Sequence, residues 1–305
     1  MICMGFSRRT FLAAGIAALA CLHAAHARAA PFASERISVR VEGSGPDVVL
    51  IPGLNSTPLA WTLTVAAMPG YRYHLVQING FGNLPAGANN TGNVAAPVAE
   101  EIARYIGEAG LKQPAVVGHS MGGTIGLMLA ARHPDALSRL MVVDMYPYLG
   151  AIFAGPGATP AQVAAVAERI GAGMRSASPE QRAARAHETI NGMVDNVTMR
   201  PGAIKDSLDS DADVGARAFR ELILTNLMPE LNRITVPLTV LYVQPRTVPM
   251  PAAQFDGFYR TAYAPVKNVT LKRIPDSAHF IMWDQPQRFQ AELAAFLKAP
   301  RPIDQ

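Results

Sequence analysis

The chain of 305 residues is 50% hydrophobic and 16% charged, with a formal net charge of +4 at pH 7. That length suffices for one large α/β domain, or for a core with an inserted subdomain. The sequence has no internal repeat, low-complexity tract or long block of like charge, and nothing in it indicates binding to nucleic acid.

An export signal is predicted over residues 1–29. Residues 7–12 read Ser-Arg-Arg-Thr-Phe-Leu, a twin-arginine signature, and the apolar stretch over residues 11–22 is too short to span a bilayer. Residues 27–29, Ala-Arg-Ala, offer a cleavage site. We therefore expect a bacterial periplasmic or secreted protein without stable membrane insertion once the signal is removed. A lipoprotein attached through Cys21 is an alternative that its flanking residues match poorly.

Removal of the signal changes the charge and the cysteine content. It takes away three arginines and no acid, so the formal net charge falls to about +1. Both cysteines, Cys3 and Cys21, leave with it. We therefore expect no disulfide, thiol nucleophile or thiolate metal site in the mature protein, and no motif calls for a cofactor or a metal.

Strands and helices alternate along most of the remaining chain, which indicates a mostly parallel sheet with helices on both faces. Alternating polarity over residues 37–42 predicts an edge strand. Short apolar runs predict further strands at residues 48–51, 73–77, 115–118, 140–143, 236–243 and 268–274. Helices are predicted at residues 94–108, 124–132, 252–261 and 285–297.

Residues 145–232 interrupt this alternation. They contain proline and glycine punctuation and two amphipathic pieces, at residues 161–174 and 216–227, but no convincing strand. We predict a helical cap inserted between two core segments, residues 30–144 and 233–305.

Residues 118–122 read Gly-His-Ser-Met-Gly between a predicted strand and a predicted helix. This order is typical of a nucleophile elbow, a tight turn that exposes the Ser120 hydroxyl. Gly118 and Gly122 leave room where a Cβ would clash. The Met121 N–H lies at a helix N-terminus, where it can donate to an oxyanion.

With three further motifs, this stretch makes residues 36–298 resemble the α/β-hydrolase family. The motifs are Ile51-Pro52-Gly53-Leu54 before Trp61, Asn79-Gly80-Phe81-Gly82, and Ser277-Ala278-His279-Phe280 before Gln285-Pro286. The resemblance implies an α/β-hydrolase fold with a helical cap. Pro52 stands where the family commonly has histidine, and the fold by itself carries many different reactions.

A serine hydroxyl needs a base, and His279 is the predicted one. It follows the last predicted strand, from where it can reach over the carboxyl edge of the sheet, and it matches the base position of the family. His119 is expected to pack beside the nucleophile. The other histidines of the mature chain lie in a strand, at a helix end and in the cap: His74, His133 and His187. The resemblance also implies that the Leu54 N–H is the second oxyanion donor.

The acid departs from the usual family pattern. No carboxylate follows the strand that ends at Val243, where residues 244–248 read Gln-Pro-Arg-Thr-Val. A minority of the family takes the acid from the end of the strand after the nucleophile helix, and Asp144 stands there. We therefore predict Asp144, with Asp256 or a weakened or absent acid as alternatives. Asp276 fits better as a turn residue.

The predicted activity is that of a serine hydrolase that cleaves carboxylic esters through an acyl-enzyme. A small, apolar ester is the expected substrate. The residues predicted to line its pocket are Asn55, Tyr146, Tyr148, Phe153 and Phe280. A thioesterase, lactonase, amidase or carbon–carbon hydrolase on the same fold stays open, as does a non-catalytic binding protein.

Overall fold

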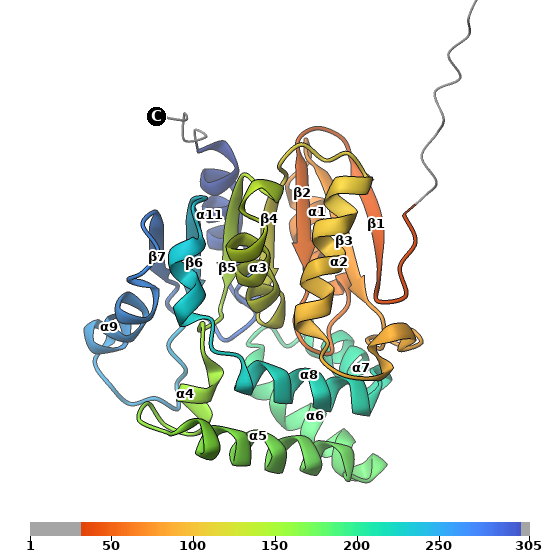
Figure 1. Cartoon of the computed structure of the whole chain (residues 1–305), viewed down its shortest axis with the longest axis vertical. Helices are drawn as coiled ribbons and strands as arrows, with labels where there is room; N and C mark the ends of the chain where they lie inside the picture. Colours follow the sequence, from red (N-terminus) through yellow and green to blue (C-terminus); the bar gives the residue numbers. More distant parts are fainter. Residues whose placement is uncertain (1–31, 300–305) are drawn as a thin grey trace, which may run out of the picture. The chain divides into compact units, whose positions relative to one another are not determined.

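A seven-stranded sheet forms the centre of the computed structural model, which describes residues 32–299 (Figure 1). The predicted signal, residues 1–29, lies outside the described residues. The strands are β1 Ile37–Gly43, β2 Asp47–Ile51, β3 Arg72–Ile78, β4 Ala115–His119, β5 Arg139–Val143, β6 Leu238–Tyr242 and β7 Val269–Arg273. Their spatial order is β1-β3-β2-β4-β5-β6-β7, and β1 alone runs antiparallel to its neighbour. The mostly parallel sheet that the sequence predicts is confirmed.

The central strands are apolar without alternation because both of their faces are covered. In β2, Val49 and Ile51 pack into one core cluster, and Val48 and Leu50 pack into the other on the opposite face. Every residue of β4 and β5 is buried. β1 alternates because it lies at the edge of the sheet, where one face meets solvent.

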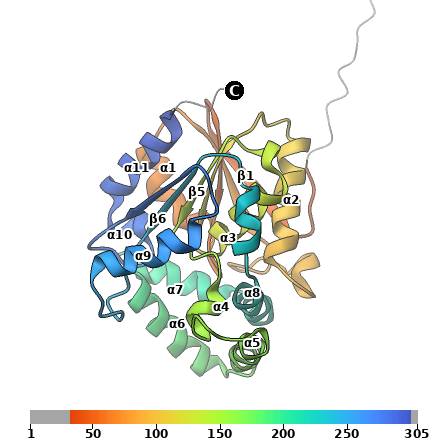
Figure 2. The ribbon, with the colours of Figure 1, turned by 60° about the vertical axis from the view of Figure 1, so that its left-hand side comes forward.

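Helices cover both faces of the sheet (Figure 2). On the face with Val49 and Ile51, the covering helices are α2 Ala95–Glu108, α3 Met121–Arg132 and α9 Ala252–Tyr263. The opposite face carries the short 3₁₀ helix η1 Pro58–Trp61 with α1 Thr62–Ala67, α10 Ile281–Asp284 and α11 Pro286–Lys298. Three further 3₁₀ helices are η2 Gly87–Asn90, η3 Pro134–Ala136 and η4 Met228–Arg233.

The chain between β5 and β6 is helical, as predicted. It forms α4 Leu149–Phe153, α5 Pro160–Arg175, α6 Pro179–Met193, α7 Arg200–Asp209 and α8 Ala212–Leu224. Because it leaves β5 at Val143, this cap lies at the carboxyl end of the parallel strands (Figure 1). Thr159 and Ser178 start α5 and α6 with capping boxes, each followed by proline at the first helical position.

Helix α8 begins four residues earlier than its amphipathic pattern predicted. The Asp211 carboxylate accepts hydrogen bonds from the N–H groups of Asp213 and Val214, both at 2.9 Å, and so caps the helix before the apolar stripe starts. Within residues 32–299, no helix has the length and apolarity needed to cross a membrane.

A buried carboxylate from the cap closes the open end of a core helix. Glu221 of α8 is 3% exposed and accepts hydrogen bonds from the N–H groups of Val94, Ala95 and Ala96 at 2.6, 2.7 and 2.8 Å. Val94 supplies no side-chain cap to α2. The first turn of α2 therefore finds its acceptor, and a charge that matches its dipole, in the cap.

We expect Glu221→Ala to lower the free energy of unfolding by about 3 kcal/mol, because two buried N–H groups and one partly buried N–H group lose a charged acceptor. Urea denaturation measures the loss. The matched control is Glu230→Ala, which breaks a partly exposed pair with Arg132 and should cost about 1 kcal/mol or less. Equal losses in the two variants would contradict the role given to Glu221.

Candidate active site

Ser120 occupies a strained turn between β4 and α3. Its φ is +53° and its ψ is −121°, a backbone conformation that non-glycine residues rarely adopt. The Ser120 N–H donates to the carbonyl oxygen of Val143 at 2.9 Å, which ties the turn to the end of the neighbouring strand β5. The turn directs the serine side chain into a cavity beneath the cap.

The glycines beside this turn are required for space. A Cβ on Gly118 would lie 2.1 Å from the Gly122 carbonyl oxygen, and one on Gly122 would lie 2.3 Å from the Ile51 carbonyl oxygen. Both obstacles are backbone atoms that cannot move aside cheaply. A Cβ on Gly53 would lie 3.1 Å from the Ser120 Cβ, so the loop after β2 passes directly beside the serine.

Two backbone N–H groups suit the predicted oxyanion hole by their position. Met121 is the first residue of α3, so its N–H has no acceptor within the helix. Leu54 follows Gly53 in the loop beside Ser120 and lines the same cavity. The next residue, Asn55, takes a φ of +52° that turns the chain sharply at this point. Their role as oxyanion donors stays a prediction.

His279 lies in the loop between β7 and α10, and its ring meets Asp144 at the end of β5. The His279 Nδ1 and the Asp144 Oδ2 are 2.6 Å apart. The second carboxylate oxygen, Oδ1, accepts from the Val243 N–H at 3.0 Å, which orients the group. An ionised carboxylate only accepts, so Nδ1 carries the hydrogen and Nε2 keeps a free lone pair.

The backbone of the His279 loop is held on both sides of the histidine. The Ala278 N–H donates to the Asp284 carboxylate at 3.0 Å, and the Phe280 N–H donates to the Met193 carbonyl of the cap at 3.2 Å. Asp284 also accepts from the N–H groups of Asp195 and Asn196 in the cap, both at 2.9 Å. Burial raises the pKa of the Asp284 carboxyl, while these hydrogen bonds oppose the shift.

His119 packs beside the nucleophile, as expected from the sequence, and also contacts the His279 loop. Its Nε2 lies 3.1 Å from the His279 carbonyl oxygen, which can only accept, so Nε2 is the donor. Its ring contacts those of both His279 and Phe280, with centroids 4.6 and 4.5 Å away. Burial, and secondarily the charge of His279, lowers the pKa of His119 well below its usual value, which keeps the ring neutral.

Asp256, the alternative acid, is engaged elsewhere. Asp256 on α9 pairs with Arg273 and accepts from the Tyr242 hydroxyl, both at 2.9 Å. Asp276 has a φ of +58°, in keeping with its predicted turn. The Gln244 side chain donates to two carbonyl oxygens of its own loop, those of Val248 and Met250, at 3.1 and 2.8 Å.

Ser120 and His279 open into a cavity of about 600 Å³ between the core and the cap, a volume typical of small-molecule sites. Two of the five predicted pocket residues, Asn55 and Phe280, line it. The lining does not include Tyr146, Tyr148 or Phe153. Tyr146 packs edge-on against Tyr259, the ring of Tyr148 lies against Gly150 of α4, and Phe153 is 42% exposed beside Phe219. The pocket prediction is corrected for these three residues.

Sequence reasoning missed most of the cavity wall, which the cap helices supply. The apolar lining includes Met145, Leu149, Ile170, Met174, Ile190 and Leu222. The lining residues of α6 stand at 182, 185, 186, 189, 190 and 193, which is the spacing of one helix face. That period is present in the sequence, but it does not reveal that the face borders a cavity.

Among the residues that the structure describes, no group of three His, Cys, Asp or Glu side chains could hold a metal ion. The reacting groups that the site brings together are a serine, a histidine and a carboxylate. Such a set can transfer a proton from the serine hydroxyl to the histidine while the carboxylate stabilises the resulting imidazolium.

Comparison with known proteins gives one matching family, described as the alpha/beta hydrolase family, whose model covers residues 48–292. A curated relative, pimeloyl-(acyl-carrier protein) methyl ester esterase of Vibrio vulnificus (strain YJ016), is 27% identical over 210 residues, covering 67% of this chain and 77% of the relative. Two solved structures share the fold. The esterase of Exiguobacterium antarcticum has a TM-score of 0.69 at 21% identity, covering 86% of this chain and 96% of that one. The enol-lactonase of Burkholderia xenovorans LB400 has a TM-score of 0.68 at 18% identity, with the same coverage.

We expect Ser120→Gly to be more stable than Ser120→Ala by about 1 kcal/mol. Both variants lack the hydroxyl, so the difference isolates the backbone, and glycine adopts a φ of +53° without the cost that a Cβ brings. Thermal or urea denaturation of the two variants measures it. If Ser120→Ala were as stable as Ser120→Gly, or more stable, the turn would not be strained in solution.

Proposed function

The chain belongs to the alpha/beta hydrolase family, and from this premise we propose that it is a serine hydrolase of carboxylic esters. One observation carries the proposal: the 2.6 Å hydrogen bond between Asp144 and His279, the histidine that lines the same cavity as Ser120. The histidine side chain is 21% exposed and the aspartate side chain 10% exposed, so the pair is largely shielded while the histidine still reaches the cavity.

The proposed reaction has two halves. The Ser120 Oγ attacks the ester carbonyl carbon while His279 Nε2 takes the hydroxyl proton, and the alcohol leaves with that proton as the acyl-enzyme forms. Water then attacks the acyl carbon and gives a proton to His279. His279 returns a proton to the Ser120 oxygen as the acyl–serine bond breaks and the carboxylic acid departs. The N–H groups of Leu54 and Met121 stabilise the oxyanion in each half.

Esterase relatives and the cavity lining support an ester with an apolar part. The curated relative from Vibrio vulnificus acts on a methyl ester by its name. Apolar side chains from Met145, Ile170 and Leu222 offer burial to an acyl chain, and each buried CH₂ group contributes about 0.8 kcal/mol. We therefore propose esters of small alcohols as the substrates.

We also propose that the enzyme acts outside the cytoplasm. The support is in the sequence: the twin-arginine signature over residues 7–12, the short apolar stretch that follows it, and the absence of cysteine after residue 21.

Labelling with a fluorophosphonate tests the proposal directly, because this reagent reacts with a serine only when a base activates it. We expect one label, located on Ser120 by peptide mapping, and loss of both labelling and p-nitrophenyl ester hydrolysis in Ser120→Ala. A label on another serine would place the active site elsewhere. A folded protein that takes no label and hydrolyses no ester would be a binding protein on this fold.

The acid is tested by Asp144→Asn, which should lower kcat by about three to four orders of magnitude, as in other serine triads. Asparagine tolerates the φ of +52° at this position, so the shape survives while the tautomer and charge support for His279 are lost. Asp256→Asn is the matched control and should stay within a few-fold of wild type, because that carboxylate pairs with Arg273 instead. The reverse result would exchange the two roles, and near-normal rates in both would leave His279 without an essential acid.

A further inference from the structure

The wall that the cap gives to the cavity is basic. Arg169 of α5 and Arg182 and Arg185 of α6 line it, and no Asp or Glu among residues 32–299 does so. Ser120 and His279 border the same cavity from the core side. The cavity thus has the reacting groups on its core wall, apolar side chains from both parts, and three guanidinium groups on its cap wall.

The overall composition of the cap does not explain why its cavity wall is basic. Residues 145–232 contain ten Asp or Glu and eight Lys or Arg, so the cap carries more acid than base. Seven of the ten acids have ion-pair or hydrogen-bond partners away from the cavity. These pairs are Glu168 with Arg220, Asp195 with Arg246, Asp209 with Lys205, Asp213 with Arg217, Glu230 with Arg132, Asp206 with Thr57 and Glu221 with the start of α2.

Arg169 and Arg185 keep N–H donors free for a ligand, whereas Arg182 is held by the cap backbone. Arg182 donates to the Ser210 carbonyl oxygen at 3.0 Å, which holds α6 against the turn between α7 and α8. Arg185 makes only long contacts, 3.4 and 3.5 Å, to the Gly173 carbonyl oxygen of α5. Gly173 lies one helical turn after Arg169 on the same face of α5, so Arg169 and Arg185 extend from adjoining sites on the two helices.

Adjacent guanidinium groups without a carboxylate partner form a binding site for an anion. Each presents up to five N–H donors in a planar fork that matches a carboxylate or a phosphate, and the approach of a negative charge relieves their mutual repulsion. We propose that the substrates of this site are esters that carry a negative charge, a carboxylate or a phosphate, at the end remote from the scissile bond, bound by Arg169 and Arg185. This inference rests on the proposed ester hydrolysis at Ser120.

The test compares kcat/KM for monomethyl esters of linear dicarboxylic acids of increasing length with that for the dimethyl ester of each acid. The wild-type enzyme should prefer the charged member at its best length by about tenfold, and the preference should shrink with added salt. Methyl esters of ω-phosphorylated hydroxy acids distinguish a phosphate site from a carboxylate site. The proposal would be overturned if the ratio of kcat/KM for the charged ester to that for the neutral ester were one or less at every chain length, for both the carboxylate and the phosphate series.

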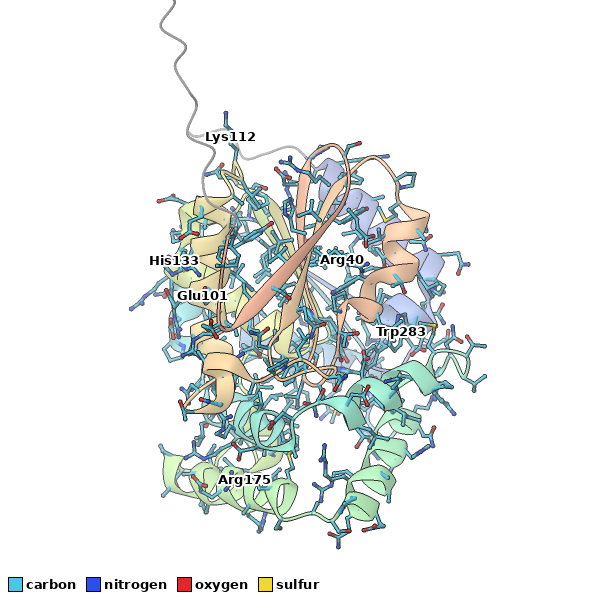
Figure 3. The ribbon with its side chains drawn as sticks, turned by 90° about the vertical axis from the view of Figure 1, so that its right-hand side faces the viewer. Arg40, Glu101, Lys112, His133, Arg175 and Trp283 are labelled. Carbon is cyan, nitrogen blue, oxygen red and sulfur yellow. The ribbon has the colours of Figure 1, made fainter. Side chains whose placement is uncertain are left out.

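Variants locate the preference. The double change Arg169→Gln with Arg185→Gln should reduce the ratio of charged to neutral kcat/KM about tenfold. The matched control is Arg175→Gln, which removes a charge from the last turn of α5 outside the cavity lining (Figure 3) and should leave the ratio unchanged. An equal reduction in the control would assign the effect to the general field of the cap and contradict a site at Arg169 and Arg185.

A binding measurement separates this inference from the proposed function. Titration calorimetry on Ser120→Ala with the same monomethyl and dimethyl esters needs no turnover. Tighter binding of the charged ester, lost in the double arginine change, would sustain the anion site even if the wild-type protein hydrolysed nothing. Equal binding of both esters would overturn it, even if Ser120 took the fluorophosphonate label.

Discussion

The hydrogen bond between His279 and Asp144 is the constraint on which the rest of the site depends. It joins residues 135 positions apart and requires the loop after β7 to reach back across the end of β6 to β5. Ser120 is held at the same edge of the sheet because its own N–H is bonded to the Val143 carbonyl, one residue before Asp144. Three strand ends therefore converge at one edge of a parallel sheet, where the chain can present side chains without breaking the ladder.

The cap does more than cover this edge. The Met193 carbonyl of the cap accepts a hydrogen bond from the Phe280 N–H, next to His279. The cap loop at residues 195–196 donates to Asp284, which in turn holds the backbone before His279. The Asp206 carboxylate accepts from Thr57 beside the predicted oxyanion loop. A displacement of the cap would therefore disturb the base as well as the cavity wall. Most of its carboxylates are engaged in contacts away from the cavity, and none of them lines the cavity wall beside the arginines.

Expectations that rested on local patterns agree with the structure, whereas the pocket prediction, which needed neighbours across space, holds for only two of its five residues. The apolar runs became the buried parallel strands, because a strand covered on both faces must be apolar throughout. Tyr146, Tyr148 and Phe153 were placed in the pocket because they closely follow Asp144 in sequence. Met145 and Leu149 of this segment do line the cavity, but most of the cap wall comes from the later helices α5 to α8. The helical period of such a helix marks a face without saying what lies opposite.

The sheet, the inserted helices and the turn at Ser120 could be predicted from the sequence, since each depends on residues close together in the chain. The glycines two residues before and two residues after Ser120 indicate a crowded turn, because the backbone passes within 2.1 and 2.3 Å of where their Cβ atoms would be. Which carboxylate bonds to His279 depends on contacts between distant parts of the chain. Asp144, Asp256 and Asp276 are chemically alike, and the sequence could only rank them. Strand order brought Asp144 to the histidine, while Arg273 and Tyr242 engaged Asp256, and contacts between distant segments are the one source of that distinction.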